Sequence, residues 1–473
     1  MSRTPIGDML RDNAGRDRLR FHMPGHKGRG HRIFAEDITE IPGADNLHDP
    51  QGVIAESQRV IASLYRARES RLLVGGTTAG ILAALLAGAG PEGRVLIPTN
   101  AHRSVFAAMH IGRLSGHFID PAFAHEPWFP KSVSVEAVET ALDRDPEICG
   151  MILTSPTYYG TVSDTAAIAG ALHRRGKWLI VDEAHGAHLA FWNGGPRAAL
   201  DCGADVVVSS THKILGAPTM GSVLLIGSER IDSGRISDWL SQIESSSPSY
   251  LLMAGIEAAV VEGAEASERV FHAIAEAHDW AVKRFSDPAS NLFLIDGPAS
   301  LYDKSKWVFG VRDGSGLAIA QTLRERYGLY FEMETPEILL AMTGIGTTAE
   351  DLGNLIEAMA RVNGPAPENP VPPVQMATLS AGRFNQRVPF WRAADLPKRS
   401  CPLTQAAGQI AGQMLIPYPP GVPAALPGDT LSPDMVSALT ALVRQGVPVL
   451  GVEQDQIQVL AFNHKSNKGE QDV

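Results

Sequence analysis

The chain has 473 residues, of which 44% are hydrophobic and 20% are charged, so it is long enough for two or three domains with sizeable cores. Its 41 basic and 52 acidic residues give a net charge of −11, which argues against a nucleic-acid partner and is compatible with a small cationic ligand. No segment approaches the roughly 18 consecutive apolar residues of a membrane span, so no membrane partner is expected.

The N-terminus and the cysteines indicate a protein of the reducing cytoplasm. Residues 1–20 are polar and charged and lack the apolar stretch of a signal peptide. The three cysteines lie far apart, with no C-x-x-C pair and no histidines at metal-binding spacing: Cys149, Cys202 and Cys401. We interpret them as small buried side chains and expect no metal site.

In chain order, residues 1–45 are polar and rich in glycine and predict an arm rather than a domain. Residues 46–285 alternate short apolar runs with helical stretches, which favours a large α/β domain with a mostly parallel sheet covered on both faces. The predicted strands are Arg71–Val74, Arg94–Ile97, Gly150–Thr154, Trp178–Val181, Val206–Ser209 and Ser222–Ile226. The predicted helices are Thr78–Leu86, Val135–Leu142, Ala166–Arg175 and Leu251–Ala275.

Two further units follow the large domain. Residues 286–363 predict a smaller α+β domain, residues 364–374 are rich in proline and predict a linker, and residues 375–473 predict a C-terminal α+β domain. The elements predicted for the smaller domain are strands at Asn291–Ile295 and Trp307–Val311 and a helix at Leu317–Arg326.

A turn rich in glycine and threonine, Gly75–Gly80, lies between a predicted strand and a predicted helix. A helix N-terminus offers unpaired amide groups and the positive end of the helix dipole, and glycine lets a phosphate group approach closely. The hydroxyls of Thr77 and Thr78 add possible donors. The alternative is that these residues only cap the helix, so the turn predicts a phosphate site through its partners downstream rather than alone.

Polar side chains follow two later strands. His102 comes after the second strand, where it can stack on a flat ring; a surface loop histidine is the alternative. Asp182 ends an apolar strand, and a buried carboxylate needs a partner such as a protonated pyridine nitrogen; a helix cap or a structural ion pair is the alternative. Alternation along the chain points Ala184 to the same side as Asp182, against the ring face opposite His102.

Lys213 follows the apolar strand Val206–Ser209, at the edge where α/β sheets place their chemistry. A lysine and an aspartate at two such strand ends are what a pyridoxal 5′-phosphate (PLP) site needs, because the lysine forms a Schiff base and the carboxylate keeps the pyridine nitrogen protonated. Desolvation favours the neutral amine that this reaction requires. Ser210 and His212 are close enough in sequence to reach the phosphate. A solvated lysine is the alternative, but the order of phosphate turn, histidine, aspartate and lysine favours PLP.

Together these motifs resemble those of the ornithine/lysine/arginine decarboxylases, a family of fold type I PLP enzymes. The chain is most similar to the short bacterial members that lack an N-terminal wing, and the resemblance covers residues from about 20 to 465. Thr78 stands where the family often has serine, and Glu334 stands where an aspartate might be expected. The matching motifs are Phe21–Gly28, Leu47–Pro50, Gly76–Thr78, Asn100–Ser104, Thr157–Gly160, Asp182–His188, Ser210–Lys213, Ser246–Tyr250 and Ile416–Gly421.

The resemblance implies an aspartate aminotransferase-like large domain and a role for each matching residue. Lys213 would carry the Schiff base, His102 would stack on the ring, and Asp182 would pair with the pyridine nitrogen. Lys213, His102 or a nearby acid would return a proton to the substrate. The coenzyme contacts implied in this way are Gly76, Thr77, Thr78, His102, Asp182, Ala184, His185, Ser210, His212 and Lys213.

The implied reaction is the α-decarboxylation of a basic amino acid (arginine, lysine, ornithine or a close analogue) to the amine, a polyamine precursor, and CO2. A cationic substrate tail needs an acidic partner, for which the candidates are Asp45, Asp49, Glu332 and Glu334. Fold type I enzymes build paired active sites at a dimer interface, which implies at least a homodimer.

Alternatives remain for the reaction and for one loop. Residues 22–27 either help to close an active site, including that of a neighbouring subunit, or form a plain surface loop. Another fold type I reaction, transamination or aldol cleavage, is the rival function, and Arg312 or Arg361 could then bind the α-carboxylate. A non-enzymatic relative would usually have lost the lysine or the aspartate, and this chain keeps both.

Overall fold

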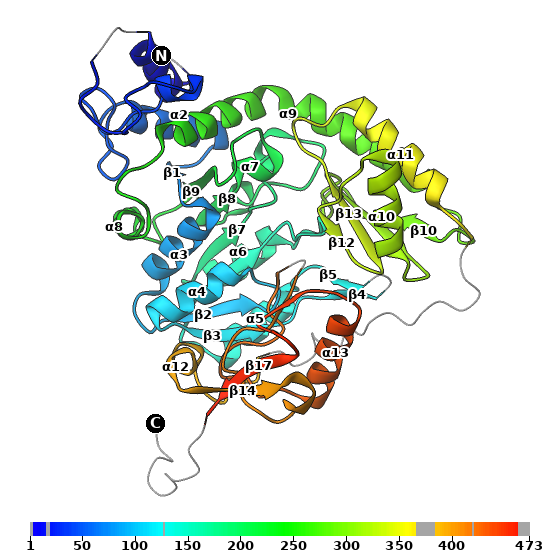
Figure 1. The fold of residues 1–473 in the computed structure, drawn as a ribbon. Coiled ribbons are helices and arrows are strands. Elements are labelled where there is room, and N and C mark those ends of the chain that lie inside the picture. The colour runs from blue at the N-terminus through cyan, green and yellow to red at the C-terminus, as the bar shows by residue number, and fades with distance from the viewer. Residues whose placement is uncertain (1–2, 16–18, 126–127, 366–383, 419–420, 462–473) are drawn as a thin grey trace, which may run out of the picture.

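The computed structural model describes residues 3–15, 19–125, 128–365, 384–418 and 421–461. Most of the predicted linker at 364–374, the start of the predicted C-terminal domain and the pair Pro419-Pro420 lie outside these ranges. Figure 1 shows a large layered α/β unit, a smaller unit around β10–β13 on one side of it, and a third unit around α12, α13, β14 and β17 below it.

The large unit is built on a seven-stranded sheet with the order β1-β9-β8-β7-β6-β2-β3. Five neighbouring strands, from β8 to β3, run parallel. At one edge β9 runs antiparallel to β8, and β1 runs antiparallel to β9 and so in the direction of the five. All six strands predicted for this domain are in the sheet; the sequence analysis missed β3, which has no apolar run. The strands are β1 Glu69–Leu73, β2 Arg94–Pro98, β3 Ser115–Ile119, β6 Ile148–Thr154, β7 Trp178–Asp182, β8 Val206–Ser209 and β9 Ser222–Ile226.

Helices cover both faces of this sheet because its central strands are apolar on both sides. Every residue of β7 is buried, as in parallel sheets sandwiched between helix layers. One core contains residues of α3 Gly76–Ala89, α4 Arg103–Gly112 and α8 Ser233–Ile243. The other contains residues of α2 Val53–Tyr65, α5 Val135–Arg144, α6 Thr165–His173 and α9 Tyr250–Arg284.

The N-terminal segment holds more structure than an arm. Helix α1 Pro5–Ala14 buries Ile6 and Leu10 in the large core, and the amides of Ile6 and Gly7 donate to the buried carboxylate of Glu257 on α9 (3.2 and 3.0 Å). The two apolar residues are too few to register as a core helix in a polar sequence, which explains why the sequence analysis predicted no helix there.

The smaller unit follows α9 and has an antiparallel sheet with the order β10-β11-β13-β12. Its strands are β10 Leu292–Leu294, β11 Lys306–Val311, β12 Met333–Glu334 and β13 Ile338–Met342, and its helices are α10 Gly316–Tyr327 and α11 Ala349–Val362. The third unit pairs β14 Lys398–Pro402 with β17 Gln456–Leu460 and adds α12 Phe390–Asp395, β15 Ile416–Pro417, α13 Pro433–Arg444 and β16 Val449–Leu450. The fold is thus the predicted α/β class with two smaller α+β units. Among the described residues, no helix is both long and apolar enough to cross a membrane.

Candidate active site

A cavity lies at the carboxyl ends of the central strands, the edge at which open α/β sheets bind ligands. It receives side chains from β6 and β7 and from the segments that follow β2, β7 and β8, and these four strands are adjacent in the sheet. Five predicted site residues line it: His102, Asp182, Ala184, His185 and Lys213. The other lining residues are Asn100, Pro130, Thr154, Thr157, Tyr158, Tyr159, Gly421 and Val422.

Asp182 is the last residue of β7 and is 3% exposed. The amide of Ala184 donates to its Oδ1 (3.2 Å), which fixes one carboxylate oxygen and the turn after the strand. Its register partners are Thr154 on β6 and Val208 on β8, so the carboxylate sits at the centre of the sheet edge. The helix-cap alternative does not apply, because η2 Leu189–Phe191, the first helix after β7, begins seven residues later.

Lys213 lies in the short helix α7 Thr211–Ile214, directly after β8. Its side chain opens into the cavity, and its Nζ is 3.1 Å from Nε2 of His185. The cavity walls still exclude enough water for burial to lower the pKa of the Lys213 amine; Asp182 opposes this shift through its negative charge. A lowered pKa increases the fraction of neutral amine, which is the form that attacks a carbonyl.

His185 is buried beside Lys213, and its ring meets the ring of Tyr158 edge-on (5.2 Å between centroids). Burial and the nearby ammonium groups lower the pKa of His185 well below its usual value, so the ring is neutral. His102 lies across the cavity at the start of α4. Its Nδ1 is 3.3 Å from the amide of Ser104, so it caps this helix while its ring lines the cavity.

The predicted phosphate residues gather beside the cavity, at the start of α3. Gly76 has a φ of +72°, a conformation that favours glycine, and Gly75 is the residue before the first turn. The threonines therefore do not cap α3. The hydroxyl of Ser210 lies 3.4 Å from that of Thr77, which joins the end of β8 to this turn, and Thr78 is exposed.

His212 adds a constraint on any phosphate bound there. Its Nδ1 donates to the carbonyl of Gly221 (2.9 Å), so Nε2 carries no proton when the ring is neutral. Burial lowers the pKa of His212. The ring can therefore donate to a phosphate only if the charge of that phosphate raises the pKa again.

The cavity wall holds buried polar atoms that have no hydrogen-bond partner among the described residues. They are Oδ1 of Asn100, Oγ1 of Thr154 and Nδ1 of His185. Unpaired buried polar groups are costly, so such a wall fits a ligand with hydrogen-bonding substituents, as a substituted pyridine ring has. The sequence analysis assigned no role to Asn100 or Thr154. Their position at strand ends β2 and β6 was the available signal.

The two smaller units complete the site. Gly421 and Val422 of the C-terminal unit line the cavity, and Glu332, next to β12 of the smaller sheet, accepts a hydrogen bond from the hydroxyl of Tyr158 (2.7 Å). Burial and the Glu332 carboxylate both raise the pKa of Tyr158, which keeps the hydroxyl protonated as the donor. The negative charge of Glu332 also acts on Lys213.

Glu332 differs from the other candidate acids, which have structural partners elsewhere. Asp45 accepts backbone hydrogen bonds at the start of α2, including those of Gln51 and Gly52, and Glu334 pairs with Arg324 (2.5 Å). Asp49 accepts from the side chain of Gln51 (3.0 Å). None of these three lines the cavity. Glu332 does not line it either, but its hydrogen-bond partner Tyr158 does.

The arginines of the rival reaction are also placed elsewhere. Arg312 donates to the carbonyl of Ser290 (3.2 Å) and lies over the ring of Phe293, and Arg361 pairs with Glu357 on the surface of α11. The segment 22–27 does not line the cavity of its own chain either: His26 bonds to Asp37 (3.1 Å) at the far N-terminal side.

The sheet topology and the placement of His102, Asp182 and Lys213 at the carboxyl ends of adjacent strands together define an enzyme of the fold type I class, with PLP as its coenzyme. Comparison with known proteins identifies the family within this class. The family model of the Orn/Lys/Arg decarboxylase major domain matches residues 4–315, and the model of the C-terminal domain of the same family matches residues 393–455. The chain therefore belongs to the Orn/Lys/Arg decarboxylase family, and it is an amino-acid decarboxylase.

Individual relatives agree with this assignment. The uncharacterized protein YaaO of Bacillus subtilis is 31% identical, over 98% of this chain and all of that protein, and an arginine decarboxylase of the same organism is 26% identical over 97% of both chains. The crystal structure of a lysine decarboxylase from Francisella novicida superposes with a TM-score of 0.80 at 17% identity, covering 97% of this chain and 81% of that one. The resemblance to the short members of the family is confirmed.

Proposed function

We propose that this enzyme removes the α-carboxylate of a basic amino acid, with arginine as the first candidate, and releases the corresponding amine and CO2. The observation that carries the proposal is the Tyr158–Glu332 pair at the cavity, which offers a carboxylate to a cationic tail within electrostatic reach of Lys213. Arginine comes first because several relatives that match nearly the whole chain are named arginine decarboxylases.

In this proposal each predicted site residue has one task toward PLP. Lys213 would hold the coenzyme covalently, His102 would stack on its ring, and Asp182 would keep the ring nitrogen protonated. The start of α3 would hold the phosphate, with Gly76, Thr77, Thr78, Ser210 and His212 as its contacts, and Ala184 and His185 would complete the ring site. When bound, PLP supplies a ring that withdraws the electron pair left behind by the departing CO2.

The residues around the ring then control protons and water. Lys213 and the neutral His185 form a hydrogen-bonded pair from which a proton can return to the substrate α-carbon. Asp182 would pair with the ring nitrogen, and that contact would add to the hydrogen bond from Ala184 in compensating for the burial of the carboxylate. Glu332 fixes the tail, and so orients the bond to the α-carboxylate for cleavage.

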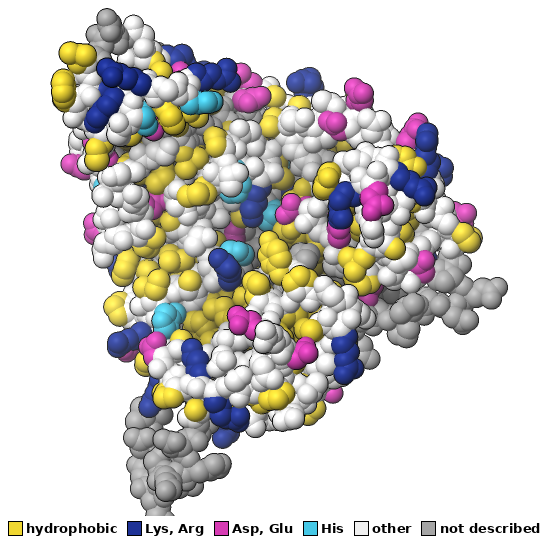
Figure 2. All heavy atoms as spheres, viewed as in Figure 1, with side chains coloured by type: hydrophobic (Ala, Val, Ile, Leu, Met, Phe, Trp, Pro, Cys, Tyr) yellow, Lys and Arg dark blue, Asp and Glu magenta, His cyan; other side chains and the backbone are white. Residues whose placement is uncertain are grey.

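We further propose that the chain works as a homodimer or a larger homo-oligomer. The segment just before Gly28 leaves large apolar side chains in solvent: Leu19, Phe21 and Met23 are 82%, 92% and 62% exposed. Figure 2 shows basic and hydrophobic side chains gathered over this N-terminal segment, while acidic and basic groups are mixed over the rest of that face. A second copy that covers this segment would remove the exposed apolar area.

Product analysis tests the proposed reaction. Purified protein is incubated with PLP and an equimolar pool of arginine, lysine and ornithine, and amines and 2-oxo acids are quantified by mass spectrometry. We expect one amine and no 2-oxo acid. Glu332→Gln should raise KM by about 10–100-fold, because a charge-assisted contact is lost, whereas Glu334→Gln, which removes a carboxylate paired with Arg324, should not. A 2-oxo acid, or equal effects of both variants, contradicts the proposal.

A further inference from the structure

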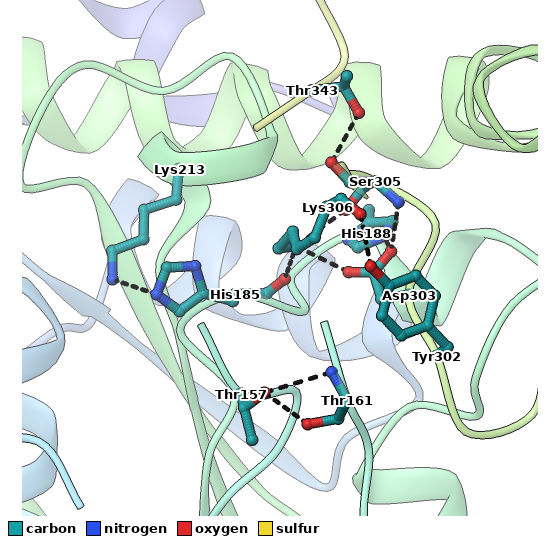
Figure 3. Close-up of polar contacts among 10 residues, drawn as sticks. All are labelled: Thr157, Thr161, His185, His188, Lys213, Tyr302, Asp303, Ser305, Lys306 and Thr343. Atoms are coloured by element: carbon teal, nitrogen blue, oxygen red, sulfur yellow. Dashed lines mark hydrogen bonds and ion pairs between the residues drawn. The ribbon is translucent and has the colours of Figure 1, made fainter. Parts of the chain in front are cut away.

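A second lysine lies behind the active site, fully enclosed by protein. Lys306 is the first residue of β11 and is 0% exposed. All three of its ammonium donors have acceptors: Asp303 Oδ2 (2.7 Å), Ser305 Oγ (2.8 Å) and the backbone carbonyl of His185 (2.8 Å) (Figure 3). Burial lowers the pKa of Lys306, and the charge and hydrogen bond of Asp303 oppose this shift, so the ammonium form depends on that counter-ion.

Asp303 is the matching anion. It is also 0% exposed, and its Oδ1 lies 3.2 Å from Nε2 of His188 and accepts from the amide of Ser305 (3.0 Å). Burial alone would raise the pKa of Asp303, but the Lys306 ammonium and His188 hold it below its usual value. Lys306 and Asp303 therefore form an ionised pair inside the protein.

This pair joins the smaller unit to two loops of the large unit. His185 and His188 belong to the loop after β7, and Gly160 belongs to the loop after β6, where its carbonyl accepts from the amide of Asp303 (2.7 Å). Gly160 has a φ of +89°, and a Cβ there would lie 2.9 Å from the carbonyl oxygen of Asp303. Both loops supply walls of the cavity.

We infer that Lys306 is a positioning residue that holds His185 against Lys213 and supplies a fixed positive charge behind them. The chain of contacts is short. Lys306 Nζ binds the His185 carbonyl, and the ring of the same histidine lies 3.1 Å from Lys213 Nζ (Figure 3). The importance of this placement for turnover depends on the proposed function, but the placement itself does not.

A purely structural role would not require an ion pair at this point. Burying two charges costs desolvation, and a well-packed apolar pair often stabilises a protein as much or more. The ion pair also acts on the active site, because the positive charge of Lys306 lowers the pKa of both Lys213 and His185. It thereby favours the neutral amine at Lys213.

The test uses coenzyme-free protein and measures how the reactivity of Lys213 toward an amine-modifying reagent depends on pH, read by peptide mass spectrometry. The main variant is Lys306→Met with Asp303→Asn, which removes both charges and leaves no lone ion inside. We expect the pH at which half of Lys213 is reactive, its labelling midpoint, to rise by about half a pH unit or more. In the loaded enzyme, kcat should fall about tenfold with KM within about threefold.

Lys304→Met is the matched control. Lys304 lies two residues from Lys306 and pairs with Asp279 outside the cluster, so this variant removes the same charge without touching His185. We expect its Lys213 midpoint and kcat to equal those of the wild type. A single Asp303→Asn variant removes the counter-ion of Lys306. The buried amine then loses its proton, so the positive charge that lowers the pKa of Lys213 is removed, and the midpoint should rise with a smaller loss of kcat.

The outcomes are separable from those of the proposed function. Labelling needs no substrate, so a shifted midpoint supports the inference even if arginine is not decarboxylated. A folded double variant with a wild-type midpoint and kcat overturns it. If the double variant does not fold, the Asp303→Asn variant is the test, and an unchanged Lys213 labelling midpoint in that variant overturns the inference.

Discussion

Lys213 and Lys306 are the same residue type in two neighbouring environments, and they behave as different chemical groups. Lys306 is sealed and touches a carboxylate at 2.7 Å, so it is a fixed cation. Lys213 opens into a cavity, and the group within hydrogen-bond distance of its amine is the neutral ring of His185. Contact partners, more than burial, therefore decide which amine is reactive.

The same comparison applies to the acids. Asp303 pairs with a lysine, Glu332 accepts a hydrogen bond from a hydroxyl at the cavity, and Asp182 faces the cavity with one oxygen held by Ala184. An acid whose counter-charge comes from a ligand marks a binding site, whereas an acid paired within the protein marks a structural contact. The following predictions test this distinction, beginning with the largest effect.

Lys213→Ala should have the largest effect, because it removes the reactive amine of the pair. We expect kcat to fall by at least about 10³-fold and the visible absorbance of the bound coenzyme to be lost, since no other lysine of the described residues lines the cavity. The measurements are steady-state kinetics and an absorbance spectrum of the purified variant. Lys304→Met provides the control for general effects of removing a lysine. A variant that keeps both activity and absorbance would place the attachment at another residue.

Asp182→Asn should have the next largest effect. Asparagine keeps the shape, and its Oδ1 still accepts from Ala184, but it lacks the charge that holds a ring nitrogen protonated. We expect kcat to fall by about 10²–10³-fold, with little change in thermal stability, because a transition-state interaction is lost. Product formation is followed together with a thermal melt. Equal losses of stability and activity would identify Asp182 as a structural residue instead.

Local sequence signals were sufficient for six of the seven strands of the central sheet and for the chain order of the site residues. Apolar runs such as 178–181 and 206–209 mark buried parallel strands, and polar residues directly after them mark one sheet edge. The site assignments for Lys213 and Asp182 rest on that geometry and stay predictions until variants are measured.

Contacts between distant segments could not be predicted in the same way. Glu332 and Tyr158 meet across 174 positions, and Lys306 and His185 meet across 121. Nothing local distinguishes Glu332 from Glu334, or Lys306 from Lys304, because each pair differs only in what the fold places against it. Segments with few apolar residues, such as α1 and β3, were missed because they carry no clear apolar pattern: α1 buries few side chains, and no residue of the edge strand β3 is fully buried.

Tyr158→Phe should have an intermediate effect and sharpens the comparison of the acids. It removes the hydroxyl that donates to Glu332 and keeps the ring against His185. We expect KM for the basic substrate to rise by about tenfold, because the hydrogen bond that holds the Glu332 carboxylate is lost, with kcat reduced less. Tyr159→Phe is the control, since the hydroxyl of Tyr159 lies 3.9 Å from the sulfur of Met333 instead. Equal KM changes in both variants would contradict a specific role for the pair.

Glu183→Gln should leave activity nearly unchanged and alter only the dependence of stability on pH. Glu183 is buried next to Asp182, accepts from the amide of Ala199 (2.7 Å), and burial raises its pKa to about 8. The folded protein thus keeps a proton that the unfolded chain releases above about pH 4.3, so this group makes the free energy of unfolding fall as pH rises from about 4.3 to about 8. Glutamine stays neutral throughout, so the variant should lose this decline, on the order of a few kcal/mol over the window.

Denaturant unfolding at pH 5 and pH 8 measures the free energy of unfolding of the Glu183→Gln variant and the wild type, with the exposed Glu229→Gln as control. Parallel curves for Glu183→Gln and wild type would mean that Glu183 is ionised in the folded protein and needs a cationic partner, as Asp303 does.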